Sequence, residues 1–137
     1  MVVLDTSVIF KWFDLKEDNR TQATRILKRH LEGTLQILTY DLLLYELTNA
    51  WVTKSKLLFL RIRTYLQNFL KYNIPIVPFN IKRIENAMLL ARKFNVSVYD
   101  ATFAALAQEH GCKLVTADTD FLRHLQASYI VHLRDFV

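Results

Sequence analysis

Short apolar runs alternate with helical patterns along the whole chain, and this alternation limits the fold more than any other feature. Residues 2–4 form a continuous apolar run that ends at Asp5, as a strand buried in a parallel sheet would. Later runs of β-like composition occupy residues 35–38, 74–78, 113–116 and 129–131. The segments between them repeat apolar residues at helical spacing. Strands that alternate with helices favour an α/β fold with a largely parallel sheet.

The expected helices lie just after Asp5, from about residue 19 to 31, over 80–94 and from about 100 to 110, with two more inside 41–72 that break near 54–56. Ile84, Met88 and Ala91 are predicted to share the apolar face of the helix over 80–94. Because proline cannot donate to a central ladder, Pro75 and Pro78 predict that the third strand lies at the sheet edge.

Glycine is rare in this chain, and its positions exclude several functions. Gly33 and Gly111 are the only two glycines, and each follows a helical segment and precedes a strand, where a helix stop is expected. The chain therefore lacks the phosphate-cradling loops GxGxxG and GxxxxGK(S/T). ATPase, GTPase and Rossmann dehydrogenase functions are disfavoured for this reason.

Length and composition predict one domain over residues 1–137. The 52% share of hydrophobic residues excludes a disordered chain, and the single Cys112 excludes a disulfide framework. No apolar run is long enough for a signal-peptide core or a membrane span. We therefore expect a soluble, cytoplasmic protein with no membrane partner.

Four acidic residues from separated stretches are expected at one edge of the sheet. Asp5 ends the first strand and Asp118 follows the fourth, and ligand sites of open α/β sheets lie outside these carboxyl ends. Glu46 lies in the helix after the second strand, and Asp100 begins the helix that leads into the fourth. A site of carboxylates without His or Cys selects hard cations, so the predicted cofactor is Mg²⁺ or Mn²⁺.

Each acid also has a simpler explanation. Asp5 and Asp100 could be helix N-caps, and Glu46 could be a surface residue. Asp118 and Asp120 could be turn residues. Taken singly these explanations are favoured, but the joint placement at strand ends favours a shared site.

Four short motifs then support a resemblance that spans nearly the whole chain. They are VVLDTS at 2–7, YEL at 45–47, YDA at 99–101 and LVTADTDF at 114–121. In this order and spacing they resemble the PIN-domain ribonuclease family and, within it, the VapC-type toxins of toxin–antitoxin pairs.

The resemblance implies a three-layer α/β/α sandwich with a parallel five-stranded sheet of strand order 3-2-1-4-5. It also implies a homodimer, a small antitoxin partner and a metal-dependent endoribonuclease. From the negative charge of the phosphodiester we further expect hydrolysis of RNA by metal-activated water, leaving a 5′-phosphate and a 3′-hydroxyl. The implied catalytic and metal-binding residues are Asp5, Glu46, Asp100 and Asp118, with Asp120 ranked fifth. The hydroxyls implied to hold these carboxylates belong to Thr6 or Ser7 and to Thr116.

Charge is distributed unevenly along the chain. Residues 54–93 carry nine basic residues and one acid, within a chain of net charge +5. Lys54, Lys56, Arg61 and Arg63 follow Glu46 closely, so we predict that they guide the RNA backbone toward the acids.

Two alternatives within the family stay open, a standalone RNA-processing nuclease and a non-catalytic RNA- or protein-binding module. A haloacid-dehalogenase-type enzyme is disfavoured, because it needs a second Asp two residues after Asp5, where this chain has Ser7.

Overall fold

The computed structural model describes residues 1–136 and contains a parallel five-stranded sheet. The strands are β1 (Val2–Leu4), β2 (Ile37–Tyr40), β3 (Ile76–Val77), β4 (Lys113–Thr116) and β5 (Ile130–His132). They lie in the order β3-β2-β1-β4-β5, with Val2 beside Ile37 and Leu4 beside Val115. The predicted strand order is confirmed.

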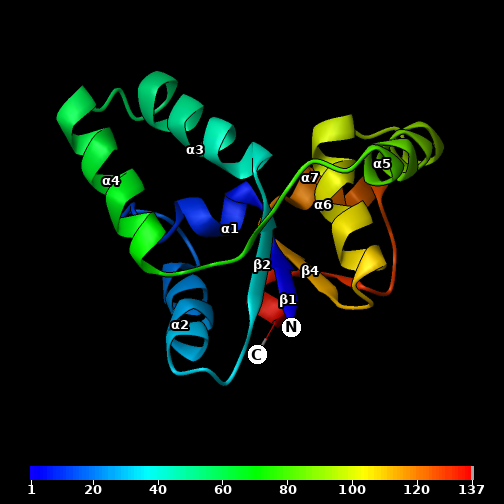
Figure 1. The fold of residues 1–137 in the computed structure, drawn as a ribbon, viewed down its shortest axis with the longest axis horizontal. Helices are drawn as coiled ribbons and strands as arrows, with labels where there is room; N and C mark the ends of the chain where they lie inside the picture. Colours follow the sequence, from blue (N-terminus) through cyan, green and yellow to red (C-terminus); the bar gives the residue numbers. More distant parts are fainter. Residues whose placement is uncertain (137) are drawn as a thin grey trace.

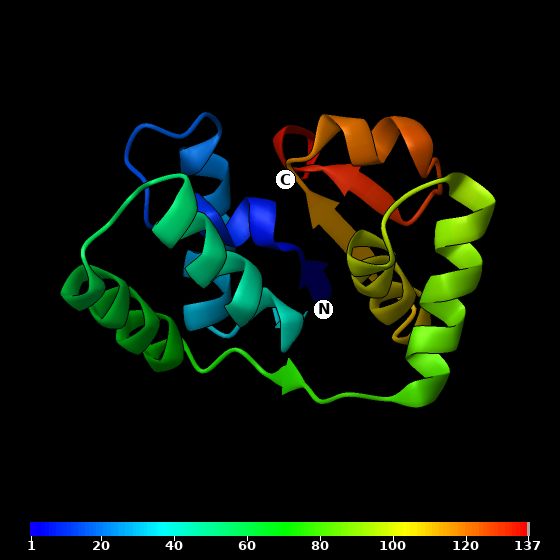
Figure 2. The same cartoon turned by 90° about the horizontal axis from the view of Figure 1, so that it is seen from above.

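Helices cover both faces of the sheet, as Figures 1 and 2 show. They are α1 (Thr6–Phe10), α2 (Arg20–Leu31), α3 (Leu42–Thr53), α4 (Phe59–Lys71), α5 (Ile81–Phe94), α6 (Val98–Glu109) and α7 (Thr119–His124), followed by the 3₁₀ turn η1 (Leu133–Asp135). Helices α1 to α4 lie on one side of the sheet, and α5 and α6 lie on the other (Figures 1 and 2). The predicted three-layer α/β/α fold is confirmed, whereas α7 was not anticipated.

The core forms between the central strands and the helices on each face. Every residue of β1 is buried, as expected for a strand with neighbours on both sides. Helix α6 is buried along most of its length because it lies between the sheet and α5. Four alanines form the contact between α5 and α6: Ala87, Ala91, Ala101 and Ala105. Their small side chains allow the two helices to approach closely.

Proline and glycine act as predicted. Strand β3 is an edge strand of only two residues, and Pro75 and Pro78 flank it. Gly33 has φ +71° and Gly111 has φ +58°, a left-handed conformation that residues with a Cβ rarely adopt. Each glycine follows the last turn of a helix and lets the chain turn toward a strand.

The buried face of α5 agrees with the prediction at Ala91 and differs from it at Met88. Met88 is 55% exposed, whereas Arg83, Ala87 and Ala91 are buried. Arg83 occupies a buried position of this helix although it is charged, and hydropathy alone does not predict a buried arginine. Within residues 1–136, no helix is long and apolar enough to cross a membrane.

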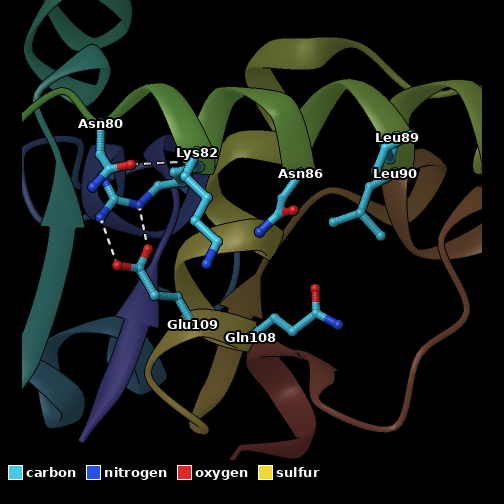
Figure 3. Close-up of a pocket in the computed structure, with 8 residues that line it drawn as sticks. Asn80, Lys82, Asn86, Leu89, Leu90, Gln108 and Glu109 are labelled. Carbon is cyan, nitrogen blue, oxygen red and sulfur yellow. Dashed lines mark hydrogen bonds and ion pairs between the residues drawn. The ribbon is translucent and has the colours of Figure 1, made fainter.

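The Arg83 guanidinium joins three elements. Its Nε donates to Glu109 Oε2 at 2.7 Å and its Nη2 donates to Glu109 Oε1 at 3.1 Å, the bonds that reach the Glu109 carboxylate in Figure 3. Its Nη1 donates to the Pro78 carbonyl at 3.0 Å, and the guanidinium lies 5.5 Å from the centre of the Tyr40 ring. Arg83 thus connects α5 to the end of α6 and to the edge of the sheet.

Candidate active site

The four predicted acids line one cleft at the carboxyl end of the sheet. Asp5 follows β1 directly, and Asp118 comes two residues after β4. Glu46 reaches the cleft from α3 and Asp100 from the first turn of α6. The cleft has a volume of about 520 Å³. Four elements that are far apart in sequence therefore each contribute a carboxylate to the lining of one cleft.

Asp5 is both the N-cap of α1 and the deepest of these carboxyls. Its Oδ1 accepts hydrogen bonds from the Ser7 hydroxyl at 2.6 Å and from the Val8 N–H at 3.3 Å. Burial raises the pKa of Asp5 to about 6, against the lowering effect of hydrogen bonds from Ser7, Thr116 and Val8. The charge of Asp100 raises this pKa further. Asp5 is therefore both a helix N-cap and a cleft residue, because its Oδ1 accepts the capping hydrogen bond while the residue lines the cleft.

Glu46 and Asp100 repeat this pattern. The Thr6 hydroxyl donates to Glu46 Oε2, and the Ser97 hydroxyl donates to Asp100 Oδ2 at 2.6 Å. Burial raises the pKa of each carboxyl, while the hydrogen bond from Thr6 or Ser97 lowers it. The charge of Asp100 raises the pKa of Glu46, and the charge of Asp118 raises that of Asp100. The carboxyls therefore disfavour one another's ionised forms across the cleft.

Asp118 caps α7 and is positioned from β4. Its Oδ1 accepts from the backbone N–H groups of Asp120 and Phe121, each at 2.9 Å. Its own N–H donates to the buried Thr116 hydroxyl at 3.0 Å. Asp120, by contrast, does not line the cleft; its exposed carboxylate pairs with Arg123 at 3.1 Å.

The Ser7 hydroxyl ties β1 to β4 beneath the acids. It donates to Asp5 and accepts from the Ala117 N–H at 2.8 Å, and it lies 3.4 Å from the Thr116 hydroxyl. Two of the predicted hydroxyls donate directly to carboxylates, Thr6 to Glu46 and Ser7 to Asp5. The third, that of Thr116, accepts from the Asp118 backbone N–H and helps to lower the pKa of Asp5.

The donor set suits a hard divalent cation. All four groups are carboxylates, and each of three has a pKa raised by burial and by the charge of another, a cost that a bound cation would relieve. In residues 1–136, no three His, Cys, Asp or Glu side chains lie close enough together to form a ready-made coordination shell. The donor chemistry fits Mg²⁺ or Mn²⁺.

Only one of the four predicted basic residues reaches the acids. Lys54, at the end of α3, lines the cleft, whereas the exposed residues Lys56, Arg61 and Arg63 do not line it. Sequence reasoning missed Lys11, Glu17 and Asn49, which also line it. Asn49 could have been found, because it lies three residues after Glu46 on the same face of a helix. Lys11 and Glu17 carry no such periodic signal.

A second cavity, of about 550 Å³, lies between α5 and α6 and is shown in Figure 3. Its one lining carboxylate, Glu109, is already paired with Arg83. The cavity therefore lacks the free oxygen ligands that the acidic cleft provides.

The sheet order and the acidic cleft at its carboxyl edge define the class, an α/β/α protein whose site consists of carboxylates from β1, α3, α6 and the end of β4. A family model described as PIN domain matches residues 2–125, and the chain belongs to the PIN domain family. No match to the sequence was found among curated proteins.

Solved structures share this fold at low sequence identity. A toxin–antitoxin complex from Klebsiella pneumoniae is 17% identical, with a TM-score of 0.71 over 97% of this chain and 98% of that one. VapC20 of Mycobacterium tuberculosis, described as a sarcin–ricin loop cleaving toxin, is 15% identical, with a TM-score of 0.68 over 93% and 98%. FitAcB from Neisseria gonorrhoeae is 19% identical, with a TM-score of 0.68 over 99% and 100%.

Proposed function

We propose that residues 1–137 form a single PIN domain that acts as a metal-dependent endoribonuclease, the toxin of a VapBC-type pair. The observation that carries the proposal is the meeting of four carboxylates in one cleft, three of them with raised pKa values. Membership of the PIN domain family supports it. So does the fold shared with a toxin described as cleaving the sarcin–ricin loop, an RNA target that fits a cytoplasmic enzyme.

In this proposal Asp5 and Asp100 are the main ligands of Mg²⁺ or Mn²⁺, and Glu46 and Asp118 complete the acidic set. When bound, the ion supplies positive charge to the phosphodiester and lowers the pKa of a water molecule. The hydroxyls of Thr6 and Ser7 hold the carboxylates of Glu46 and Asp5, and the Thr116 hydroxyl holds the backbone at Asp118. Asp120 is paired with Arg123 and is not assigned as a metal ligand in this proposal.

The test compares cleavage of RNA by the purified wild type with that by Asp5→Asn and Asp100→Asn. We expect each substitution to abolish Mg²⁺-dependent cleavage, and excess EDTA to do the same to the wild type. Asp41→Asn is the matched control, because this acid begins α3 without a side-chain capping bond and does not line the cleft. Undiminished cleavage in EDTA, or a 2′,3′-cyclic phosphate on the product, would overturn the proposal.

The proposed partners are a second copy of the chain and a small antitoxin, bound over α3 and α4. Large apolar side chains are exposed there, with Leu58 81%, Phe59 76% and Leu60 71% exposed. One of the similar structures is a toxin–antitoxin complex. Phe59→Ser is expected to shift the protein toward a monomer in light scattering. Leu15→Ser, an equally exposed site before α2, is the control.

A further inference from the structure

An ion pair lies in the wall of the acidic cleft, between Lys11 and Glu17. Lys11 Nζ is 2.7 Å from Glu17 Oε2, and both residues line the same cleft as the four carboxylates. The Lys11 side chain is 9% exposed and that of Glu17 is 35% exposed. Glu17 is the hydrogen-bond partner that the structure shows for this ammonium within residues 1–136.

Lys11 stands at the opposite end of α1 from Asp5. It follows the last residue of the helix, so it lies about 9 Å from Asp5 along the helix axis. The pKa values of Asp5, Glu46 and Asp100 are set by burial, by hydroxyl and backbone hydrogen bonds and by one another's charges. Lys11 is therefore not among the groups that set the pKa values of these three acids.

Stability does not account for the ion pair either. Burying an ammonium costs hydration, and a buried ion pair generally adds little stability compared with apolar side chains of similar size. An ammonium also has three donors, of which the carboxylate uses one. Lys11 lines the cleft, and within residues 1–136 the structure shows no second hydrogen-bond partner for its ammonium.

Under the proposed function, positive charge on the cleft wall favours entry of the RNA phosphates. Its walls carry five carboxylates, including Glu17, and two ammonium groups, those of Lys11 and Lys54. Lys54 is exposed at the end of α3, whereas Lys11 is buried and already held in position. A positioned cation loses less side-chain entropy on binding a phosphate than a free one.

We propose that Lys11 binds a phosphate of the RNA backbone inside the cleft, and that Glu17 holds the ammonium in position until this phosphate replaces it as partner. The assignment rests on the proposed function for the nature of the substrate. Exchange of one anion for another keeps the buried ammonium paired at each stage. Glu17 thus competes with the RNA that Lys11 binds.

The experiment measures binding of a short fluorescent oligoribonucleotide by anisotropy in Mg²⁺, over a series of KCl concentrations. Asp100→Asn is present in every protein to prevent cleavage. Lys11→Met is expected to weaken binding about tenfold, as loss of a charged hydrogen bond does. It should also reduce the slope of log affinity against log salt by about 0.7, the share of one single-strand phosphate.

Glu17→Gln gives the opposite sign, because the amide still accepts a hydrogen bond from Lys11 but no longer competes as an anion. We expect it to tighten binding. Lys16→Met is the matched control, since Lys16 is an exposed lysine of the same loop and does not line the cleft. Melting temperatures of all variants are measured beside the affinities.

Parallel weakening by Lys11→Met and Glu17→Gln, with lower melting temperatures and an unchanged salt slope, would show that the pair only braces the loop. An equal effect of Lys16→Met would show general charge attraction, and either result overturns the assignment. If Lys11→Met does not fold, the sign of the Glu17→Gln effect decides.

Failure of the assignment is distinguishable from failure of the proposed function. Cleavage by the wild type together with unchanged binding by Lys11→Met would reject Lys11 alone. Lys11-dependent binding without any cleavage by the wild type would reject the nuclease and keep the phosphate contact. If no form binds RNA, both are rejected.

Discussion

Among the described residues, Asp5 is the carboxyl whose ionised form the fold disfavours most. Its pKa of about 6 lies above the ordinary value of 3.8 because burial outweighs three hydrogen bonds. Keeping this carboxyl ionised at neutral pH therefore lowers the stability of the metal-free protein. Under the proposed function, a cation bound by Asp5 would relieve that penalty.

This conflict predicts a pH dependence of stability. Because the folded-state pKa is raised, the contribution of Asp5 to stability is fully present below pH 3.8 and is lost as the pH rises through about 6. Metal-free Asp5→Asn should therefore gain stability over the wild type above pH 6, by on the order of 2 kcal/mol. Urea unfolding of both proteins between pH 4 and 7 measures the difference.

Mg²⁺ serves as the internal check on this prediction. A cation bound through Asp5 stabilises the folded state of the wild type, and it should stabilise Asp5→Asn far less. A constant difference between the two proteins across this pH range would contradict the prediction.

At this scale the sequence located the acids but not all their neighbours. Strand ends and motif order were enough to bring Asp5 and Asp118 together, because the carboxyl ends of parallel strands meet. Lys11 and Glu17 could not be found in this way. Their contact depends on the path of the irregular segment between α1 and α2, which has no periodicity to read.

Helices α5 and α6 are joined by one ion pair, in which the charge of Arg83 is buried. Arg83 has a side chain that is 3% exposed, while its partner Glu109 is 41% exposed. The two partners are therefore unequal: an unpaired Glu109 can be hydrated, whereas an unpaired Arg83 cannot. Hydropathy predicted the face of α5 incorrectly for the same reason, since the guanidinium occupies a position where an apolar residue is expected.

We predict that Glu109→Gln destabilises the protein more than Arg83→Met. Removing the carboxylate leaves a buried charge, which costs about 3 kcal/mol or more, while methionine leaves a carboxylate that water can reach. Chemical unfolding at neutral pH measures both. A larger loss for Arg83→Met would mean that the bond to Pro78 and the contact with Tyr40 matter more than the ion pair.

The same pair has a pH signature of the opposite sign to that of Asp5. Arg83 holds the pKa of Glu109 below its ordinary value, so the pair stabilises the fold above pH 4.5 and loses this effect as the pH falls through the lowered pKa. Glu109→Gln should abolish this part of the acid sensitivity.

Over the whole molecule, the four acids line the cleft, whereas most of the basic residues predicted to guide the RNA lie outside it. The carboxylates lie in the cleft, while Arg61 and Arg63 are exposed on α4 outside its lining. Pro75 and Pro78 predicted the edge position of β3 from local chemistry, whereas the sheet order was implied by the family resemblance that the four motifs carry. The sequence could not separate basic residues that line the cleft from those that only face solvent, since this depends on how α3 and α4 pack.

This arrangement predicts that basic residues on α4 contribute mainly to RNA binding, while Lys54 in the cleft contributes more to cleavage. Charge reversal of Arg61 and Arg63 together should weaken RNA binding and lower its salt dependence, while Lys54→Met should reduce cleavage more than either single reversal. Cleavage rates and salt-dependent affinities test both. Undiminished binding by the double reversal would show that α4 does not guide the RNA.

The Ser7 hydroxyl bonds to the N–H of Ala117, 110 positions further along the chain. A ribosome that has completed the first ninety residues has therefore made two of the four acids, Asp5 and Glu46, and has not yet made the strand that supports them. Under the proposed function, an unfinished chain cannot cut the RNA of the cell that is making it. Under that function, activity requires β4 to dock against β1, so the fold itself delays the hazard until the fourth strand has been made.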